Sequence, residues 1–320
     1  MGALNANFGA FAVEAAPGPA PGASARVSLD PPIPWLRLVA RVRTGTGVAY
    51  AIEATREATP DGERVQVSGR TPAAGAAVRL TRSVSDPARY AGELLRWQLA
   101  AQGVTVDGAV RRGAAAADAT VLVAFPGRPV AELVRLLNKS SHNPVAESLV
   151  KSLAVGAHGP PGEWDAGVAA LAAALRAVGL DLEGVRIADG SGLARENRVT
   201  PRLLVDVLRL ADRSFGFGPE LETSLPIAAT DGTLRERGRA IAGHVRAKTG
   251  FLSGVAALSG YASLAGGGQA VFSLLVNGAP AGDMAAIAGV EAFAAALVGE
   301  LGPSASPRPL LQESVRRPLE

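Results

Sequence analysis

The apolar residues of this chain change their spacing twice, and the order of these changes limits the folds open to it. Between residues 8 and 81 they alternate with polar residues in short runs, as in strands with one buried face. From Asp86 to about Ala211 helical spacing dominates. From His244 the alternation returns, before a last helical run to Leu301. The order favours a β-rich module followed by a mixed α/β (α+β) region that contains an antiparallel sheet.

The expected elements follow from these runs and from the turn residues between them. We expect strands at residues 8–14, 26–29, 35–42, 64–69, 77–81, 104–110, 120–125, 245–248, 256–263 and 270–277. We expect helices at residues 86–102, 130–138, 144–155, 163–178, 200–211 and 283–301. Two helix starts share one signal, a capping residue followed by proline, at Asp86 and at Thr200. The first helix is expected to bury Leu94, Leu95 and Leu99.

Composition excludes several classes of protein. The chain has no cysteine, so it forms no disulfide and no thiolate metal site. It contains no run of 18 apolar residues, and residues 1–16 lack the basic start of a signal peptide, so we expect neither a membrane span nor a signal peptide in this sequence. The net charge is only +3 and the arginines are scattered, which argues against nucleic-acid binding.

Lysine is scarce in this chain. Only three of its 32 basic residues are lysines, namely Lys139, Lys151 and Lys248. In such an arginine-rich sequence, a lysine suggests a position where arginine cannot replace it. The lysine ammonium is a compact charge with a tunable pKa, whereas the arginine guanidinium is bulky and stays protonated. Two of the three lie in or beside the motifs described next; chance placement is the simpler alternative.

The first motif is Ser-x-Asn at Ser141 and Asn143. A hydroxyl and an amide from one turn can pass a proton and hold a peptide carbonyl. The tripeptide is weak evidence, since it arises by chance about once in a chain of this length. The structural alternative is a turn between two helices, in which Ser141 or Asn143 caps the helix that starts at Pro144.

The second motif is Lys-Thr-Gly at residues 248–250, on an expected strand. It is more specific, with a chance rate of roughly a few per cent per chain. Lys248 would supply positive charge, Thr249 a hydroxyl for a substrate carboxylate, and Gly250 room for a substrate backbone that pairs with the strand edge. The alternative is an ordinary strand end with a glycine turn.

With their flanks, the motifs resemble the peptidase S13 family of D-alanyl-D-alanine carboxypeptidases and endopeptidases, the class C low-molecular-mass penicillin-binding proteins. The resemblance covers residues 1 to about 300. The segments that carry it are Val67–Gly69, Leu137–Glu147, Asp189–Leu193, Thr200-Pro201, Asp231–Leu234 and Ala247–Gly254. The resemblance implies a penicillin-binding/β-lactamase-like domain at residues 119–301. It would follow the remainder of a β-rich inserted module at residues 1–118 and precede a disordered tail at residues 302–320.

The resemblance also implies a chemistry. A serine would form an acyl-enzyme with a peptidoglycan stem peptide or a β-lactam, without a cofactor or metal, in the periplasm or outside the cell. Ser141 would relay a proton and Asn143 would orient the substrate. Lys248 and Thr249 would hold the terminal carboxylate beside Gly250, and the Phe251 N–H would join an oxyanion hole.

One family motif is missing. The family's nucleophile lies in a Ser-x-x-Lys segment ahead of the inserted module, and no lysine precedes Ser141 here. The literal match at Ser148 and Lys151 falls in an ordinary helix of the family, and we interpret it as structural. Phe251 and His142 also depart from the usual residues. We therefore expect a truncated, inactive copy with an apolar groove in place of the nucleophile helix; the alternative is a non-catalytic protein that binds wall peptide or a partner.

Overall fold

The computed structural model describes residues 2–47, 50–264, 268–279 and 282–301, and the expected tail at 302–320 lies outside these ranges. The chain divides into two compact units, residues 1–124 (unit 1) and residues 125–320 (unit 2). Within the described ranges, no helix combines the length and the apolar character that a membrane crossing requires.

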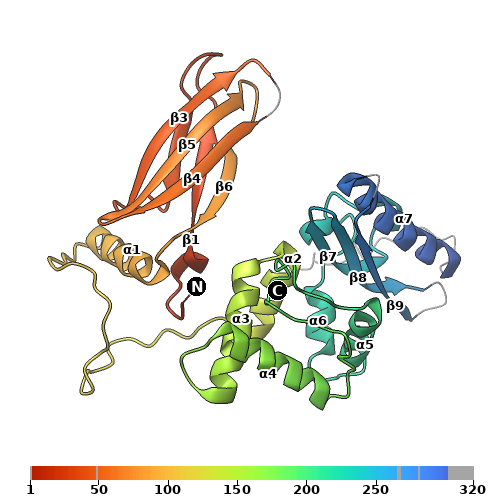
Figure 1. Cartoon of the computed structure of the whole chain (residues 1–320). Coiled ribbons are helices and arrows are strands. Elements are labelled where there is room, and N and C mark those ends of the chain that lie inside the picture. Colours follow the sequence, from red (N-terminus) through yellow and green to blue (C-terminus); the bar gives the residue numbers. More distant parts are fainter. Residues whose placement is uncertain (1, 48–49, 265–267, 280–281, 302–320) are drawn as a thin grey trace, which may run out of the picture. The chain divides into compact units, whose positions relative to one another are not determined.

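Unit 1 is built from two three-stranded sheets and one helix (Figure 1). The first sheet has the order β2-β1-β6 and the second the order β3-β5-β4, in which β3 runs parallel to β5. Its elements are η1 (Ala6–Gly9), β1 (Ala10–Ala16), β2 (Arg26–Asp30), β3 (Leu36–Gly45), β4 (Ala51–Thr59), β5 (Gly62–Pro72), β6 (Val78–Ser83) and α1 (Pro87–Ala101). Five of the six strands were predicted. Strand β4 was not, because Ala54 is its only buried residue and its alternation is correspondingly weak.

The core of unit 1 lies between its two sheets. Val13 of β1 faces Val65 and Val67 of β5, and Trp35 packs on Tyr90 of α1 with 5.9 Å between ring centroids. The Asp86 carboxylate caps α1 by accepting the Arg89 N–H at 3.0 Å, as predicted.

The prediction that α1 buries Leu95 is wrong. Leu95 is 56% exposed, and the buried residues of the helix are Tyr90 and Ala91. Leu94 packs against the core, and the next residue points about 100° further round the helix, out to solvent.

Two strands predicted after α1 are also absent. Residues 104–110 and 120–125 form no strand, and the side chains of Val121, Leu122, Val123 and Phe125 are 78–91% exposed. A strand requires a neighbour to pair its backbone groups, and no segment within the described ranges pairs with either stretch.

Unit 2 contains a helical half and an antiparallel meander of order β7-β8-β9. Its elements are α2 (Val130–Ser140), α3 (Asn143–His158), α4 (Trp164–Ala177), α5 (Pro201–Asp212), α6 (Gly218–Ser224), η2 (Gly232–Leu234), η3 (Arg239–Ile241), β7 (Val245–Leu252), β8 (Val255–Ser263), β9 (Gln269–Asn277) and α7 (Asp283–Leu301). The meander, the Thr200 cap of α5 and every helix except α6 were predicted. Helix α6 has only seven residues, too few to show a period.

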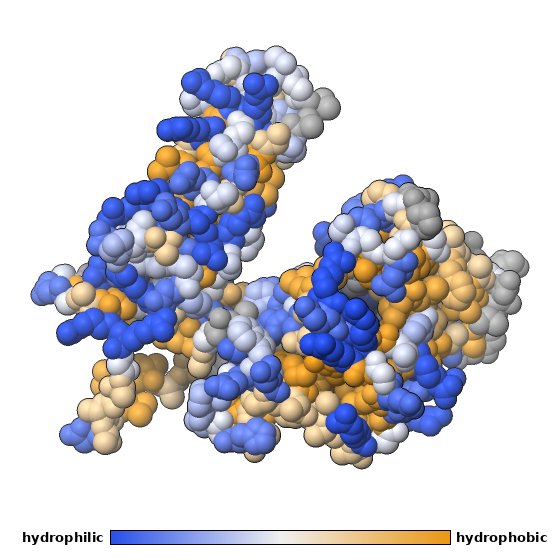
Figure 2. All heavy atoms as spheres, viewed as in Figure 1, coloured by the Kyte–Doolittle hydropathy of each residue, from blue (hydrophilic) through white to orange (hydrophobic). Residues whose placement is uncertain are grey.

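The two faces of the meander are covered differently. One face carries Ala247, Leu258 and Phe272 and packs against Val290 and Ala294 of α7. The opposite face packs Tyr261 against residues of α5 and of the segment after α6. Because successive residues of a strand point to opposite faces, Lys248 lies on the face opposite α7. Hydrophobic residues also reach the visible surface of unit 2 (Figure 2).

Candidate active site

Ser141 is held in an unfavourable backbone conformation at the end of α2. It is the C-cap residue of the helix, with φ 52° and ψ 53°, and its N–H donates to Leu137 O. The left-handed region costs a residue with a side chain roughly 1–2 kcal/mol, and such strain tends to gather at functional sites.

The structural alternative, in which Ser141 or Asn143 caps the following helix, is not observed. Helix α3 begins at Asn143, and its N-cap is His142, whose side chain forms no capping hydrogen bond. The left-handed turn brings the Ser141 hydroxyl to Lys248 instead of to the helix end. The Asn143 side chain is half-buried, at the first position of α3.

Lys248 joins the two motifs. Its Nζ donates to Ser141 Oγ at 2.9 Å and to Thr249 O at 2.7 Å. Burial lowers the pKa of the Lys248 ammonium below its ordinary value, because a charged group is less stable away from water. An amine that releases its proton more easily, next to a hydroxyl, can take part in proton transfer.

The other residues of the strand motif lie beside this contact. Thr249 Oγ1 lies 2.8 Å from Thr233 Oγ1. A Cβ on Gly250 would lie 3.0 Å from the Cβ of Ala257 on β8, so even a methyl group would be crowded at that position. The Phe251 side chain is 55% exposed.

An apolar groove adjoins the site on the face opposite α7. Its volume is about 380 Å³, and Lys248, Thr249 and Gly250 line it together with leucines of α5 and of the α6 region. The apolar lining residues are Leu204, Val207, Leu208, Leu221, Leu225, Ala257 and Leu275. An apolar groove exposed by the helical half was expected from the sequence; its relation to a missing helix stays a prediction.

Sequence reasoning missed a second cation at the site. Lys139 Nζ donates to both carboxylate oxygens of Asp231, at 2.8 and 2.6 Å, and to Leu225 O at 2.6 Å. Asp231 was expected to be mainly a turn residue. The scarcity of lysine had drawn attention to Lys139, but nothing in the sequence connects it with a carboxylate 92 residues away.

Asp189, by contrast, does hold a turn. It accepts the N–H groups of Gly192 and Ala194 and an amide N–H of Asn197 at 2.7–2.8 Å. Burial would raise the pKa of the Asp189 carboxyl, but these hydrogen bonds together outweigh it and hold the pKa below its ordinary value. The turn is further tied to α3 by Glu147, which accepts the Ser191 N–H at 3.0 Å.

The literal Ser-x-x-Lys match occupies one face of α3. Lys151 Nζ stacks on the Trp164 ring, 3.9 Å from its centroid, a cation–π contact that ties α3 to α4. This contact gives Lys151 a packing role. Among the described residues, no group of three or more His, Asp or Glu side chains could hold a metal ion.

Comparison with protein families gives one match that covers most of the chain. Residues 1–297 match the model of the D-Ala-D-Ala carboxypeptidase 3 (S13) family. A D-alanyl-D-alanine carboxypeptidase of an Actinomadura species is 41% identical over 227 residues, which are 67% of this chain and 41% of that protein. The D-alanyl-D-alanine carboxypeptidase DacB of Haemophilus influenzae is 31% identical over 228 residues, which are 70% of this chain and 47% of that protein. The chain thus spans less than half the length of these relatives.

Solved structures agree with the family match. The crystal structure of penicillin-binding protein 4 from Haemophilus influenzae aligns with a TM-score of 0.75 at 26% identity, over 93% of this chain and 67% of that one. The same protein in complex with a β-lactam aligns with a TM-score of 0.73. The penicillin-binding fold expected from the motifs is confirmed by these neighbours.

Proposed function

The chain belongs to the D-Ala-D-Ala carboxypeptidase 3 (S13) family, and from this we propose that unit 2 supplies two of the three walls of a serine D-alanyl-D-alanine peptidase site. The first wall is the turn at Ser141 and Asn143, and the second is the strand end at residues 248–251. The observation that carries the proposal is the 2.9 Å contact between Lys248 Nζ and Ser141 Oγ, which joins the two motifs across 107 residues of sequence.

Each residue receives a role that fits its position. Ser141 relays a proton to the leaving amine, and Lys248 lends it acidity through the hydrogen bond and the lowered pKa. Lys248 and Thr249 hold the terminal carboxylate of the substrate. Asn143 orients the peptide, and the Phe251 N–H contributes to the oxyanion hole, a role that needs no particular side chain.

The nucleophile is assigned to none of the 320 residues. We assign it to a Ser-x-x-Lys segment of a longer protein, packed as an apolar helix into the groove beside Lys248. Support comes from the apolar lining of the groove and from the greater length of the relatives. The serine passes its proton to the lysine of its own segment as it attacks the peptide carbonyl. The D-alanine amine leaves with the proton of Ser141, which that lysine replaces, and water then releases the acyl group.

The substrate class follows from the family. We propose that the complete protein acts on peptidoglycan stem peptides ending in D-alanyl-D-alanine, is acylated by β-lactams, and works in the periplasm or outside the cell. A carboxypeptidase requires a bound terminal carboxylate, and Lys248 with Thr249 offers the charge and the hydroxyl for it.

A fusion protein tests the proposal. The part of the Actinomadura relative that precedes the counterpart of residue 2 is joined to residue 2 of this chain, and acylation by a fluorescent penicillin is followed in time. We expect a covalent adduct on the fused segment, with a rate that falls at least roughly hundredfold in Ser141→Ala and in Lys248→Gln. Lys151→Gln is the matched control and is expected to keep the rate.

The unfused 320-residue chain is expected to form no adduct. An adduct on Ser148 of that chain would contradict the structural interpretation of Ser148 and Lys151. A folded fusion that is not acylated, or that is acylated equally well without Lys248, would contradict the proposal and favour the alternative, a non-catalytic protein that binds wall peptide.

A further inference from the structure

The end of α2 carries a nearly buried cation with all its donors satisfied. The ammonium of Lys139 has three N–H donors, and three oxygens accept from it at 2.6–2.8 Å, two of Asp231 and one of Leu225. The Lys139 side chain is only 16% exposed. Exposed ion pairs add little stability, but the lysine of this pair is largely screened from water, whereas the Asp231 side chain is 35% exposed. Lys139 lies two residues from Ser141.

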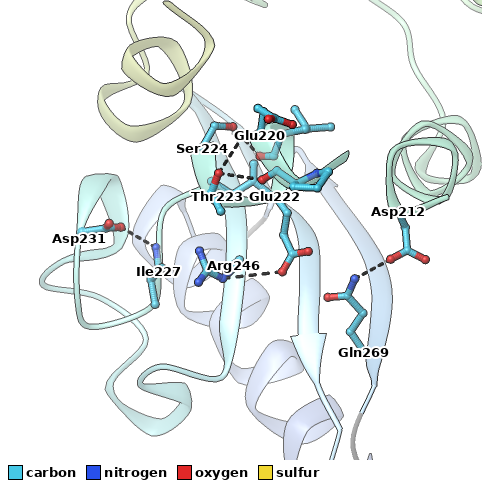
Figure 3. A network of polar contacts seen from close by, with 12 residues as sticks. Asp212, Glu220, Glu222, Thr223, Ser224, Ile227, Asp231, Arg246 and Gln269 are labelled. Atoms are coloured by element: carbon cyan, nitrogen blue, oxygen red, sulfur yellow. Dashed lines mark hydrogen bonds and ion pairs between the residues drawn. The ribbon is translucent and has the colours of Figure 1, made fainter. Parts of the chain in front are cut away.

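The Asp231 carboxylate connects this cation to the strand that carries Lys248. Its Oδ1 also accepts the Ile227 N–H at 2.8 Å (Figure 3). The segment around Ile227 pairs with β7, where Ala228 N–H donates to Val245 O and Ala247 N–H to Pro226 O at 3.0 and 2.9 Å. One carboxylate therefore bonds both the helix that ends at the first motif and the segment that borders the second.

Gly232 brings the same turn into contact with α2. Its φ is +59°, and a Cβ there would lie 2.7 Å from Lys139 O, so only glycine fits. The next residue, Thr233, then places its Oγ1 at 2.8 Å from Thr249 Oγ1.

We propose that Lys139, Asp231 and Thr233, the positioning cluster, fix the Ser-x-Asn turn against the Lys-Thr-Gly strand. The inference rests on the proposed function, for which the distance between Ser141 and Lys248 must be set before substrate binds. Ser141 is solvent-exposed at a strained turn, and its contact with Lys248 is a single hydrogen bond. The positioning cluster adds an indirect link between the same two elements, because Lys139 bonds Asp231 and Leu225 of the segment at residues 225–233 and Thr233 of that segment contacts Thr249 of the strand.

Thr233 has a separate effect on the direction of a proton. A threonine hydroxyl has one hydrogen to donate. If Thr249 donates that hydrogen to a substrate carboxylate, its oxygen is free to accept, and Thr233 must be the donor between them. Thr233 therefore orients the Thr249 hydroxyl toward the substrate and is a positioning residue, not a catalytic one.

The experiment uses the 320-residue chain with ¹³C,¹⁵N-labelled lysine. Its three lysines give three sets of side-chain signals, and the pKa of Lys248 is read from a pH titration. Ser141→Gly removes the hydroxyl that accepts from the ammonium, so we expect it to lower the pKa of Lys248. The same substitution is then made in the Asp231→Asn and Thr233→Val backgrounds. There we expect Ser141→Gly to lower the pKa of Lys248 by less than half of its effect in the unmodified chain.

Two further variants distinguish positioning from general stability. Thr233→Ser keeps the hydroxyl and is expected to restore the full effect of Ser141→Gly. Asp189→Asn removes another multiply bonded carboxylate of unit 2 and is expected to leave that effect unchanged. If Ser141→Gly changes the pKa of Lys248 by its full amount in folded Asp231→Asn and Thr233→Val, the inference is overturned. If Asp231→Asn does not fold, the comparison of Thr233→Val with Thr233→Ser decides alone.

The titration needs no nucleophile, so it is independent of the acylation test. Suppose that the fusion protein is not acylated, while the cluster variants reduce the effect of Ser141→Gly on the pKa of Lys248 as expected. This result contradicts the proposed function and supports the positioning cluster. If the fusion protein is acylated normally and the cluster variants leave the effect of Ser141→Gly on the pKa of Lys248 unchanged, only the positioning role of the cluster is contradicted.

Discussion

The two units of the molecule differ in how their sheets close a core. Unit 1 closes a single core between its sheets, with the bulky Phe11, Ile33 and Tyr90 at most 2% exposed. Unit 2 closes its core on the α7 face of the meander but leaves an apolar groove of about 380 Å³ on the opposite face, beside Lys248. The proposed site thus lies where packing is incomplete. Substitutions should therefore cost stability in the closed cores and alter chemistry near the groove.

The largest expected effect lies in unit 1, at a buried carboxylate. The Glu63 side chain is fully buried and accepts from Arg56 at 3.1 Å and from Ser85 N–H at 3.1 Å. Arg56→Met leaves this charge without its cation, so we expect the free energy of unfolding to fall by about 3 kcal/mol in urea unfolding. Arg64→Met is the matched control, since its pair with Glu57 is exposed, and should cost less than about 0.5 kcal/mol. Equal losses of unfolding free energy in the two variants would contradict the expected difference between the buried and the exposed ion pair.

Two leucines compare the faces of the meander within unit 2. Leu258 is 1% exposed in the closed core, and Leu258→Ala should cost about 3 kcal/mol. Leu204 is half-buried and lines the groove, so Leu204→Ala should cost about 1 kcal/mol or less in this chain. In the fusion protein, with the groove filled, the cost of Leu204→Ala should rise. The same small cost in both proteins would mean that the groove stays open.

Ser141→Gly should raise the stability of the chain and lower the acylation rate of the fusion protein. Glycine adopts the left-handed conformation of residue 141 without the steric penalty, so we expect a gain of about 1 kcal/mol by thermal or urea unfolding. The same variant should abolish rapid acylation of the fusion protein. A loss of stability would show that the Ser141 hydroxyl contributes more to folding than the backbone strain costs.

The helix caps give the smallest effects and a contrast in pH. Thr200→Ala and Asp86→Ala should each cost about 1 kcal/mol at neutral pH. Burial would raise the pKa of the Asp86 carboxyl, but bonds from the Arg89 N–H and from Arg112 hold it below its ordinary value of 3.8. Its contribution is therefore complete above that value and disappears as the pH falls through the folded-state pKa, whereas the Thr200 cap does not titrate. Urea unfolding of both variants at pH 7 and near pH 2 checks this: the cost of Asp86→Ala should shrink in acid and that of Thr200→Ala should not.

Local patterns predicted most of the elements and both motifs. The capped helix starts, the meander and the strand that carries Lys248 follow from alternation and from single residues such as Asp86 and Thr200. Two of the failures share a cause, because both depend on partners distant in sequence. Residues 120–125 have the composition of a strand but no neighbour to pair with, and Asp231 looks like a turn residue until its bond to Lys139 is seen. The left-handed conformation of Ser141 was not predicted either, since glycine and asparagine, and not serine, are typical of such a position.

Calorimetry tests the central claim most directly, namely that unit 2 lacks one apolar element beside Lys248. Thermal unfolding of the 320-residue chain is compared with that of the fusion protein. Burial of several large apolar side chains in the groove should raise the unfolding temperature of unit 2 by roughly 5 °C or more and leave that of unit 1 unchanged. An unfolding temperature of unit 2 that is the same in both proteins would contradict the claim.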